Sequence, residues 1–139
     1  MTHFSIRNIL VPCNKRLYDI DGALNELHEI HYRQFINVEP GALAYIYAGK
    51  PFEQGLIYVC KVVATNETHN LIDDRKYFLR PNELKNSPGK YMRLKLINEL
   101  NSAVFDYYTL REHGLKSCMQ GQCFVPDELQ AFINSIINL

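Results

Sequence analysis

The sequence predicts an α+β domain whose strands pair mainly antiparallel, and three observations lead to this fold class. Two runs dense in β-branched and aromatic residues, 42–47 and 56–64, flank a loop rich in turn formers and predict a long hairpin within residues 40–64. Helical spacing of apolar residues recurs near the start of the chain, at 19–31, and again after Pro126. The predicted order is β, α, two or more β, short α, β, α, which does not fit a doubly wound parallel sheet.

Size and composition suit one folded unit. The chain has 139 residues, of which 47% are hydrophobic, and we expect a single domain spanning 1–139. Its formal net charge is zero, which argues against attraction of the whole molecule to nucleic acid or to an anionic membrane. A local basic patch remains compatible with this balance.

The sequence also predicts a cytoplasmic location. No stretch approaches the ~18 uncharged apolar residues that a membrane span needs. Residues 1–8 lack the apolar core and the cleavage pattern of a signal peptide. In such a chain we expect the four cysteines to be reduced thiols.

The first third of the chain predicts a strand, a helix and a turn. Residues 7–12 form a short apolar run that ends at a proline. Asp19 can cap a helix that ends near His31. Its buried stripe is expected to consist of Ile20, Ala23, Leu24, Leu27 and Ile30. Residues 37–41 then form a turn before the hairpin.

The segment 65–89 is the least regular part, with a short strand or a helical turn expected near Tyr77. Residues 91–97 alternate between apolar and polar side chains, as a half-buried strand does. The remaining elements are expected at 106–113 (a short helix capped by Asp106), at 118–125 (a short strand) and from Pro126 onward (the last helix).

Enzyme signatures are missing from the sequence: there is no phosphate-binding loop, no G-x-G-x-x-G, no H-E-x-x-H and no G-x-S-x-G. His28 and His31 have a spacing that can hold a metal, but a solvated polar face explains them at least as well. We therefore predict no metal and no cofactor. Two alternatives stay open: a small enzyme that acts on a nucleotide-like ligand through Cys13 or a histidine, and a protein-interaction module that uses the hairpin edge or the last helix.

A basic segment lies between residues 75 and 95. It contains seven Lys and Arg residues and one Glu, which gives a local net charge of +6. Its basic residues are Arg75, Lys76, Arg80, Lys85, Lys90, Arg93 and Lys95. A solvated loop accounts for this charge as well as a surface that follows a nucleic-acid backbone. Under the second interpretation, the candidate backbone-binding residues are Arg75, Lys76, Arg93 and Lys95.

Several short segments together resemble EVE-type domains of the PUA-like superfamily. They are 11–14 after the first strand, 31–34 after the first helix, 38–47 with the following 49–51, 58–63, and 110–116. The resemblance implies a partly open β-barrel of about five or six mainly antiparallel strands with about three flanking helices. It also implies binding to DNA or RNA and a pocket for one flipped or modified base, as in restriction-associated readers.

The resemblance assigns site residues as well. It puts Pro12, Cys13 and Asn14 at the pocket rim, and Tyr32 in the place of the family's tryptophan. It has Arg33 or Gln34 contact the base or the backbone, and it brings Tyr47 and Lys50 to the strand end and the mouth, with Lys50 on the backbone. The domain itself would be non-catalytic, so its partners would be the nucleic acid and a separate nuclease or other protein. Stacking on aromatic faces and hydrogen bonds to the pairing edge are what a flipped base requires.

Overall fold

A long hairpin lies at the centre of the molecule. The computed structural model describes residues 6–68, 72–79 and 89–138. In it, strands β3 (Leu43–Ala48) and β4 (Gly55–Glu67) pair antiparallel, with Leu43 opposite Lys61 and Ala48 opposite Gly55. The predicted hairpin is therefore confirmed. Strand β4 extends to Glu67, beyond the predicted end, because it continues to pair with β5 through several register shifts.

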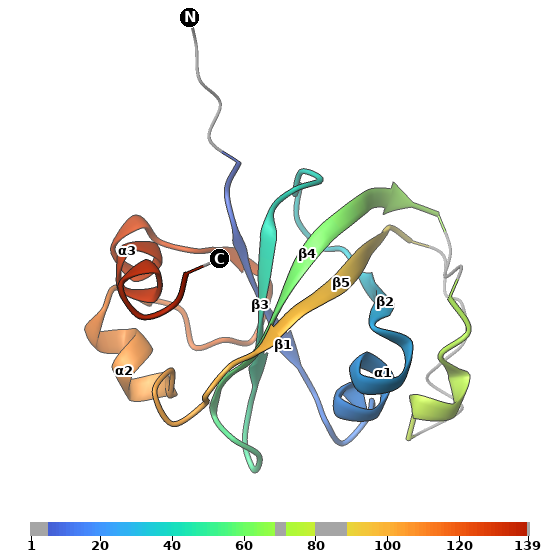
Figure 1. The fold of residues 1–139 in the computed structure, drawn as a ribbon, viewed down its shortest axis with the longest axis horizontal. Coiled ribbons are helices and arrows are strands. Elements are labelled where there is room, and N and C mark those ends of the chain that lie inside the picture. The colour runs from blue at the N-terminus through green and yellow to red at the C-terminus, as the bar shows by residue number, and fades with distance from the viewer. Residues whose placement is uncertain (1–5, 69–71, 80–88, 139) are drawn as a thin grey trace, which may run out of the picture.

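The hairpin belongs to a six-stranded curved sheet with the order β2-β5-β4-β3-β1-β6 (Figure 1). Its other strands are β1 (Ile9–Cys13), β2 (Glu29–Arg33), β5 (Tyr91–Glu99) and β6 (Cys123–Phe124). Within the described residues, only the β1–β3 pair is parallel, and the other neighbours run antiparallel. The α+β class with a mainly antiparallel sheet and three α-helices is thus confirmed.

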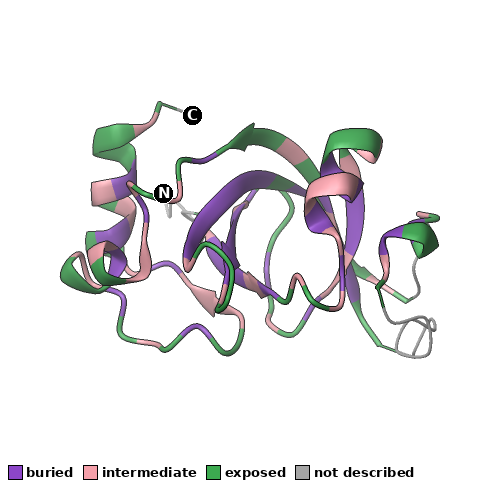
Figure 2. Ribbon diagram, turned by 90° about the horizontal axis from the view of Figure 1, so that it is seen from below, coloured by how far each residue is buried: buried purple, intermediate pink, exposed green. Residues whose placement is uncertain are grey.

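The sheet separates two apolar clusters because successive side chains of a strand point to opposite faces. One cluster contains Ile9 and Val11 and packs under helix α1 (Ile20–Leu27). The other contains Leu10 and packs under helices α2 (Tyr107–Glu112) and α3 (Asp127–Ile136). Figures 1 and 2 show α2 and α3 together on one side of the sheet and α1 on the other.

The two end strands of the sheet approach each other at a seam. The side-chain amide of Gln122, next to β6, donates to the Arg33 carbonyl oxygen at 2.6 Å and accepts from the Phe35 backbone nitrogen at 2.9 Å. It thereby replaces the ladder hydrogen bonds that a closed barrel would have here. The Tyr32 hydroxyl also donates across the seam, to the Pro12 carbonyl oxygen at 2.9 Å. The sheet is thus a partly open barrel.

The predicted end of the first helix is wrong. Helix α1 ends at Leu27, and His28 adopts a left-handed conformation (φ 61°) in which its N–H donates to the Leu24 carbonyl. Residues 29–33 then form β2, paired antiparallel with β5. Ile30 fits the helical spacing that follows Leu27, but with Tyr32 it also fits the alternation of a strand. Tertiary pairing with β5 decides in favour of the strand.

The least regular segment of the chain follows the hairpin. A single turn of 3-10 helix, η1 (Arg75–Tyr77), confirms the helical turn expected near Tyr77. Residues 69–71 and 80–88 lie outside the described residues, and so do Arg80 and Lys85 of the basic segment. Among the helices of the described chain, none is long and apolar enough to cross a membrane.

Candidate functional site

A pocket of about 370 Å³ opens where β1 ends beside β2. Four separate parts of the chain form it: the end of β1 with its following loop, β2, the β3–β4 loop, and the segment before β6. The lining residues are Pro12, Cys13, Asn14, Lys15, Tyr32, Gly49, Lys50, Phe52, Met119 and Gln120. The volume falls at the lower end of the roughly 300–1,000 Å³ found for small-molecule sites.

Asn14 shapes the rim of this pocket. Its side-chain Oδ1 accepts from the Arg16 backbone nitrogen at 3.0 Å, and its carbonyl oxygen accepts from the backbone nitrogens of Leu17 and Tyr18. This local turn reverses the chain directly after β1. With Oδ1 used by the turn, the amide Nδ2 group is what Asn14 can offer to a ligand.

Tyr32 forms a fixed aromatic part of the wall. It lies on β2, and its hydroxyl is held by the Pro12 carbonyl across the seam. Burial raises the pKa of Tyr32 above its usual range, and the nearby Cys13 adds to this effect. The hydroxyl is therefore a donor at neutral pH, and its hydrogen bond fixes the ring orientation.

Lys15 is a basic residue that the sequence interpretation missed. Its Nζ lies 2.8 Å from an Asp21 carboxylate oxygen and 2.7 Å from one of Glu53, with 10% of its side chain exposed. Burial by itself lowers the pKa of Lys15, but the hydrogen bonds to the two carboxylates outweigh burial and raise it. The same ammonium lies 5.8 Å from the ring centroid of Phe52, whose side chain is 40% exposed. Lys15 thus connects the β1 loop to the β3–β4 loop as a charged group.

Met119, Gln120 and Phe52 were also missed. Phe52 had a local signal, because it stands two residues after Lys50 in the loop of the predicted hairpin. Met119 and Gln120 had none, since only the closing of the seam brings the segment before β6 to the pocket.

Cys13 is a poor nucleophile in this setting. It is buried, and desolvation raises the pKa of its thiol to about 12, although Lys15 opposes the shift. A thiol with such a pKa holds very little thiolate at neutral pH. Its position in the wall suits contact with a ligand better than covalent chemistry.

Three predicted pocket residues do not line this pocket: Tyr47, Gln34 and Arg33. Tyr47 is 5% exposed and faces the α2 side of the sheet, with its ring 6.3 Å from that of Tyr107. Strand alternation puts it on the face opposite to Tyr32. Gln34 is buried, and its amide is used by the Ile36 carbonyl and by Asn66.

Arg33, the third of these residues, points away from Tyr32 because the two are neighbours on β2. Its guanidinium carbon lies 5.4 Å from the ring centroid of Tyr91 and 5.8 Å from that of Phe35. The guanidinium also lies against Gly89, where a Cβ would come within 2.5 Å of the Arg33 Nη2 atom. Arg33 therefore packs outside the pocket.

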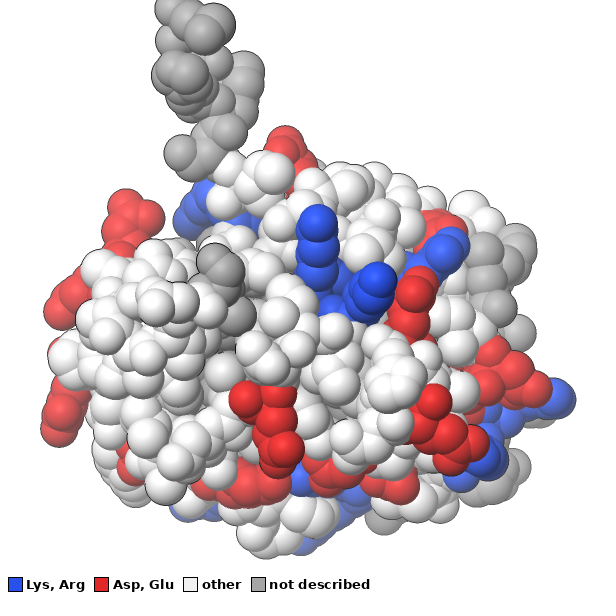
Figure 3. All heavy atoms as spheres, in the orientation of Figure 1, with Lys and Arg blue, Asp and Glu red and all other residues white. Residues whose placement is uncertain are grey.

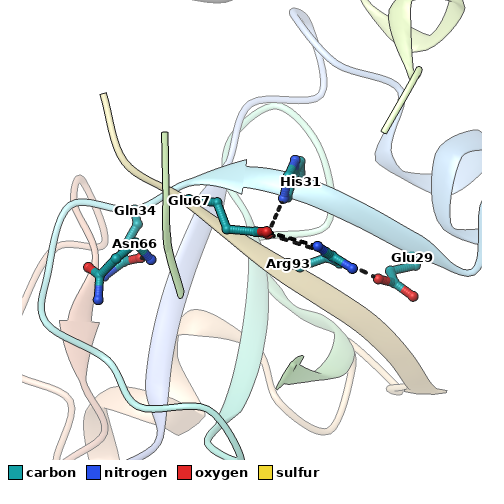
Figure 4. Close-up of polar contacts among 6 residues, drawn as sticks. All are labelled: Glu29, His31, Gln34, Asn66, Glu67 and Arg93. Atoms are coloured by element: carbon teal, nitrogen blue, oxygen red, sulfur yellow. Dashed lines mark hydrogen bonds and ion pairs between the residues drawn. The ribbon is translucent and has the colours of Figure 1, made fainter. Parts of the chain in front are cut away.

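The predicted backbone-binding residues lie apart from the pocket, except for Lys50, which lines it. Arg93 donates to Glu67 at 2.8 Å, and its Nε lies 3.5 Å from Glu29 (Figure 4). The hydrogen bond to Glu67 is the main reason why the pKa of Arg93 is raised. Glu67 also lies 2.5 Å from the fully buried His31 side chain. This cluster joins β2, β4 and β5 and has a structural role.

The other cations of the basic segment are dispersed. Arg75 pairs with Asp73, and Lys76 pairs with Glu26. Lys95 is exposed on β5, opposite Glu29 in the β2–β5 register. On the face drawn in Figure 3, basic groups lie among acidic ones rather than in one broad field. Over the described residues, the local net charge of +6 in the sequence therefore does not produce a continuous basic surface.

Comparison with known proteins places the fold. No protein-family model and no curated protein matches the sequence. The crystal structure of ASCH from Zymomonas mobilis matches with a TM-score of 0.66 and 11% identity, over 95% of this chain and 96% of that chain. A hypothetical protein from Leishmania major matches with a TM-score of 0.62 and 15% identity, over 95% and 94% of the two chains. A protein from Pseudomonas syringae matches with 0.60 and 12%, over 93% and 98%. These matches confirm the α+β fold with its six-stranded, mainly antiparallel sheet.

Proposed function

We propose that this chain is a non-catalytic nucleic-acid-binding domain of the EVE type that holds one flipped or modified base in the pocket between β1 and β2. One observation carries the proposal: Tyr32 and Phe52 line the same hollow as Lys15 and Lys50. Aromatic faces provide stacking, worth ~1–3 kcal/mol per base. Polar groups at the rim read the pairing edge of a base that has left its helix.

Different residues would serve different parts of the nucleotide. The Asn14 amide and the Gln120 side chain are the uncharged polar groups for the base edge. Lys50 is exposed at the mouth and suits a phosphate. Lys15 already has two carboxylate partners, so it fits the role of holding the loops in place. DNA and RNA both supply these features.

A binding role agrees better with the pocket chemistry than an enzymatic role does. Cys13, the thiol in the wall, has a raised pKa and little thiolate. A nuclease or other protein would therefore supply any reaction as a separate partner.

Fluorescence anisotropy with labelled oligonucleotides tests the proposal. The series consists of single- and double-stranded DNA and RNA, each with unmodified and methylated bases, at low salt. We expect one modification to bind more tightly than its unmodified counterpart. Phe52→Ala should weaken that complex by about 5- to 100-fold, the loss of one stacked base. The control is Ile136→Ala, which removes an exposed apolar side chain at the end of α3.

Two results would overturn the proposal. One is the absence of binding to every oligonucleotide at low salt. The other is a Phe52→Ala variant with unchanged affinity and unchanged preference. Thermal unfolding of each variant shows that the fold is intact, and we expect it to be, because Phe52 is partly exposed.

A further inference from the structure

A second hollow, of about 430 Å³, lies where the chain leaves β2, beside Phe124 of β6. Its lining residues are Gln34, Phe35, Ile36, Asn37, Lys90 and Phe124. Gln122, which fastens the end of β2, stands in sequence between Gln120 of the pocket and Phe124 of this hollow. Gln122 thus fastens together two chain segments that each contribute residues to both hollows: residues 32–37, and residues 119–124.

Phe35 is the most conspicuous side chain of the second hollow. It is 69% exposed, although it is a large apolar residue. Its backbone is fixed by the hydrogen bond to Gln122, and the Arg33 guanidinium lies 5.8 Å from its ring centroid. The ring is thus held in position while much of its surface remains open to solvent.

Cationic side chains lie in this hollow and next to it. Lys90 is exposed and lines the hollow. Arg7 places its guanidinium carbon 4.1 Å from the ring centroid of Phe124, another lining residue. Among the described residues that line the hollow, none is acidic. Aromatic faces interleaved with cations are typical of surfaces that bind single-stranded nucleic acid.

We propose that the second hollow is a stacking subsite for an unpaired nucleotide that neighbours the base held in the pocket. In this subsite, Phe35 stacks on the base, Lys90 meets a phosphate, and Arg33 positions the Phe35 ring. The proposal rests on the proposed function, since it makes the ligand a single strand that occupies both hollows. Phe35 follows Tyr32 by three residues, which reach at most about 11 Å, so a strand of a few nucleotides spans both sites.

The test uses 12-nucleotide oligo(U) RNA and oligo(dT) DNA, whose bases stack without sequence-specific readout. Phe35→Ala should weaken binding of at least one of them by about 5- to 100-fold, and Phe35→Trp should restore it. Lys90→Gln should reduce the slope of log affinity against log salt by about one unit. The matched control is Tyr108→Ala, because Tyr108 is an aromatic residue of α2 with 68% exposure.

The outcomes separate this proposal from the proposed function. If Phe35→Ala weakens oligonucleotide binding while Phe52→Ala has no effect, stacking on Phe35 is supported, but the base pocket and a ligand that occupies both hollows are overturned. If Phe52→Ala abolishes preference for a modified base while Phe35→Ala binds like the unaltered protein, the subsite is overturned. A loss of affinity in Tyr108→Ala as large as that in Phe35→Ala would also overturn it, since binding would then not be localised to this hollow.

Discussion

The pocket and the basic segment are the two regions where the sequence predicts nucleic-acid binding. They differ in whether their side chains converge on one hollow or pair with carboxylates of the same chain. In the pocket, residues from four parts of the chain converge on one hollow. In the basic segment, Arg75, Lys76 and Arg93 pair with carboxylates of the same chain. The comparison teaches that a run of cations in sequence indicates a binding surface only if the fold leaves it without intramolecular partners.

The largest expected effect concerns the two thiols Cys13 and Cys118. Cys118 is exposed, whereas Cys13 is buried in the pocket wall with a pKa of about 12. We expect iodoacetamide at pH 7.5 to label Cys118 at least about 100-fold faster, because only the thiolate reacts. Mass spectrometry of timed samples measures this. Equal labelling rates in the native protein would instead show that the Cys13 thiol is reactive. The pocket wall would then suit covalent chemistry as well as binding.

The next prediction tests the structural role of the cluster that Arg93 forms with Glu67, His31 and Glu29. Glu67→Gln should lower the free energy of unfolding by roughly 1–3 kcal/mol, because it leaves the Arg93 charge with a weaker partner beside the buried His31. Asp73→Asn is the matched control: it removes the exposed partner of Arg75 and should leave stability unchanged. Urea unfolding measures both. If the two variants were equally stable, Glu67 would be an ordinary surface carboxylate.

A pH series sharpens the same contrast. The hydrogen bond from Arg93, followed by that from His31, holds the pKa of Glu67 below its ordinary value of 4.5. A carboxyl with a lowered folded-state pKa stabilises the protein fully above that ordinary value, and the contribution is lost as the pH falls through the folded-state pKa. The stability difference between the unaltered protein and Glu67→Gln should therefore be constant from pH 6 to about 5 and shrink below 4.5. A difference that stayed constant down to pH 3 would contradict this.

The smallest effects separate cations that face the pocket from cations that are paired elsewhere. Lys50→Ala should weaken oligonucleotide binding by about 3- to 10-fold at low salt, through the loss of one phosphate contact. Lys76→Ala should leave binding unchanged, because Lys76 pairs with Glu26 of α1. Anisotropy titrations at two salt concentrations measure both. A larger loss for Lys76→Ala than for Lys50→Ala would make the basic segment the main binding surface.

Local patterns in the sequence predicted most of the fold. The hairpin and α3 follow from alternation, helical spacing and the proline that precedes α3, all of which are local signals. Strand β2 was missed for two reasons. Ile30 fits both the helical spacing and the alternation of a strand, and the residue that ends α1 is His28 rather than a glycine. Pairing with β5, some sixty residues away, is what makes this segment a strand.

The site was predicted only in part, for similar reasons. Pro12, Cys13, Asn14, Tyr32 and Lys50, which the family resemblance brought together, all line the pocket. Tyr47 lies on the opposite face, because strand alternation rather than proximity in sequence decides where a side chain points. Gln34 turns to Asn66 at the irregular end of β4, and Met119 arrives through the seam. Neither contact has a signature in the sequence.

The most direct test of the base pocket is a ¹H–¹⁵N NMR titration of the whole chain with methylated and unmethylated nucleoside monophosphates. The structure predicts shift changes in the amides of residues 13–15, 32, 49, 50, 52, 119 and 120, because these residues line the pocket. Amides of 107–112, on the other face of the sheet, should stay in place. Shifts confined to α2 and α3, or no shifts with any nucleotide at millimolar concentration, would contradict a base-holding pocket between β1 and β2.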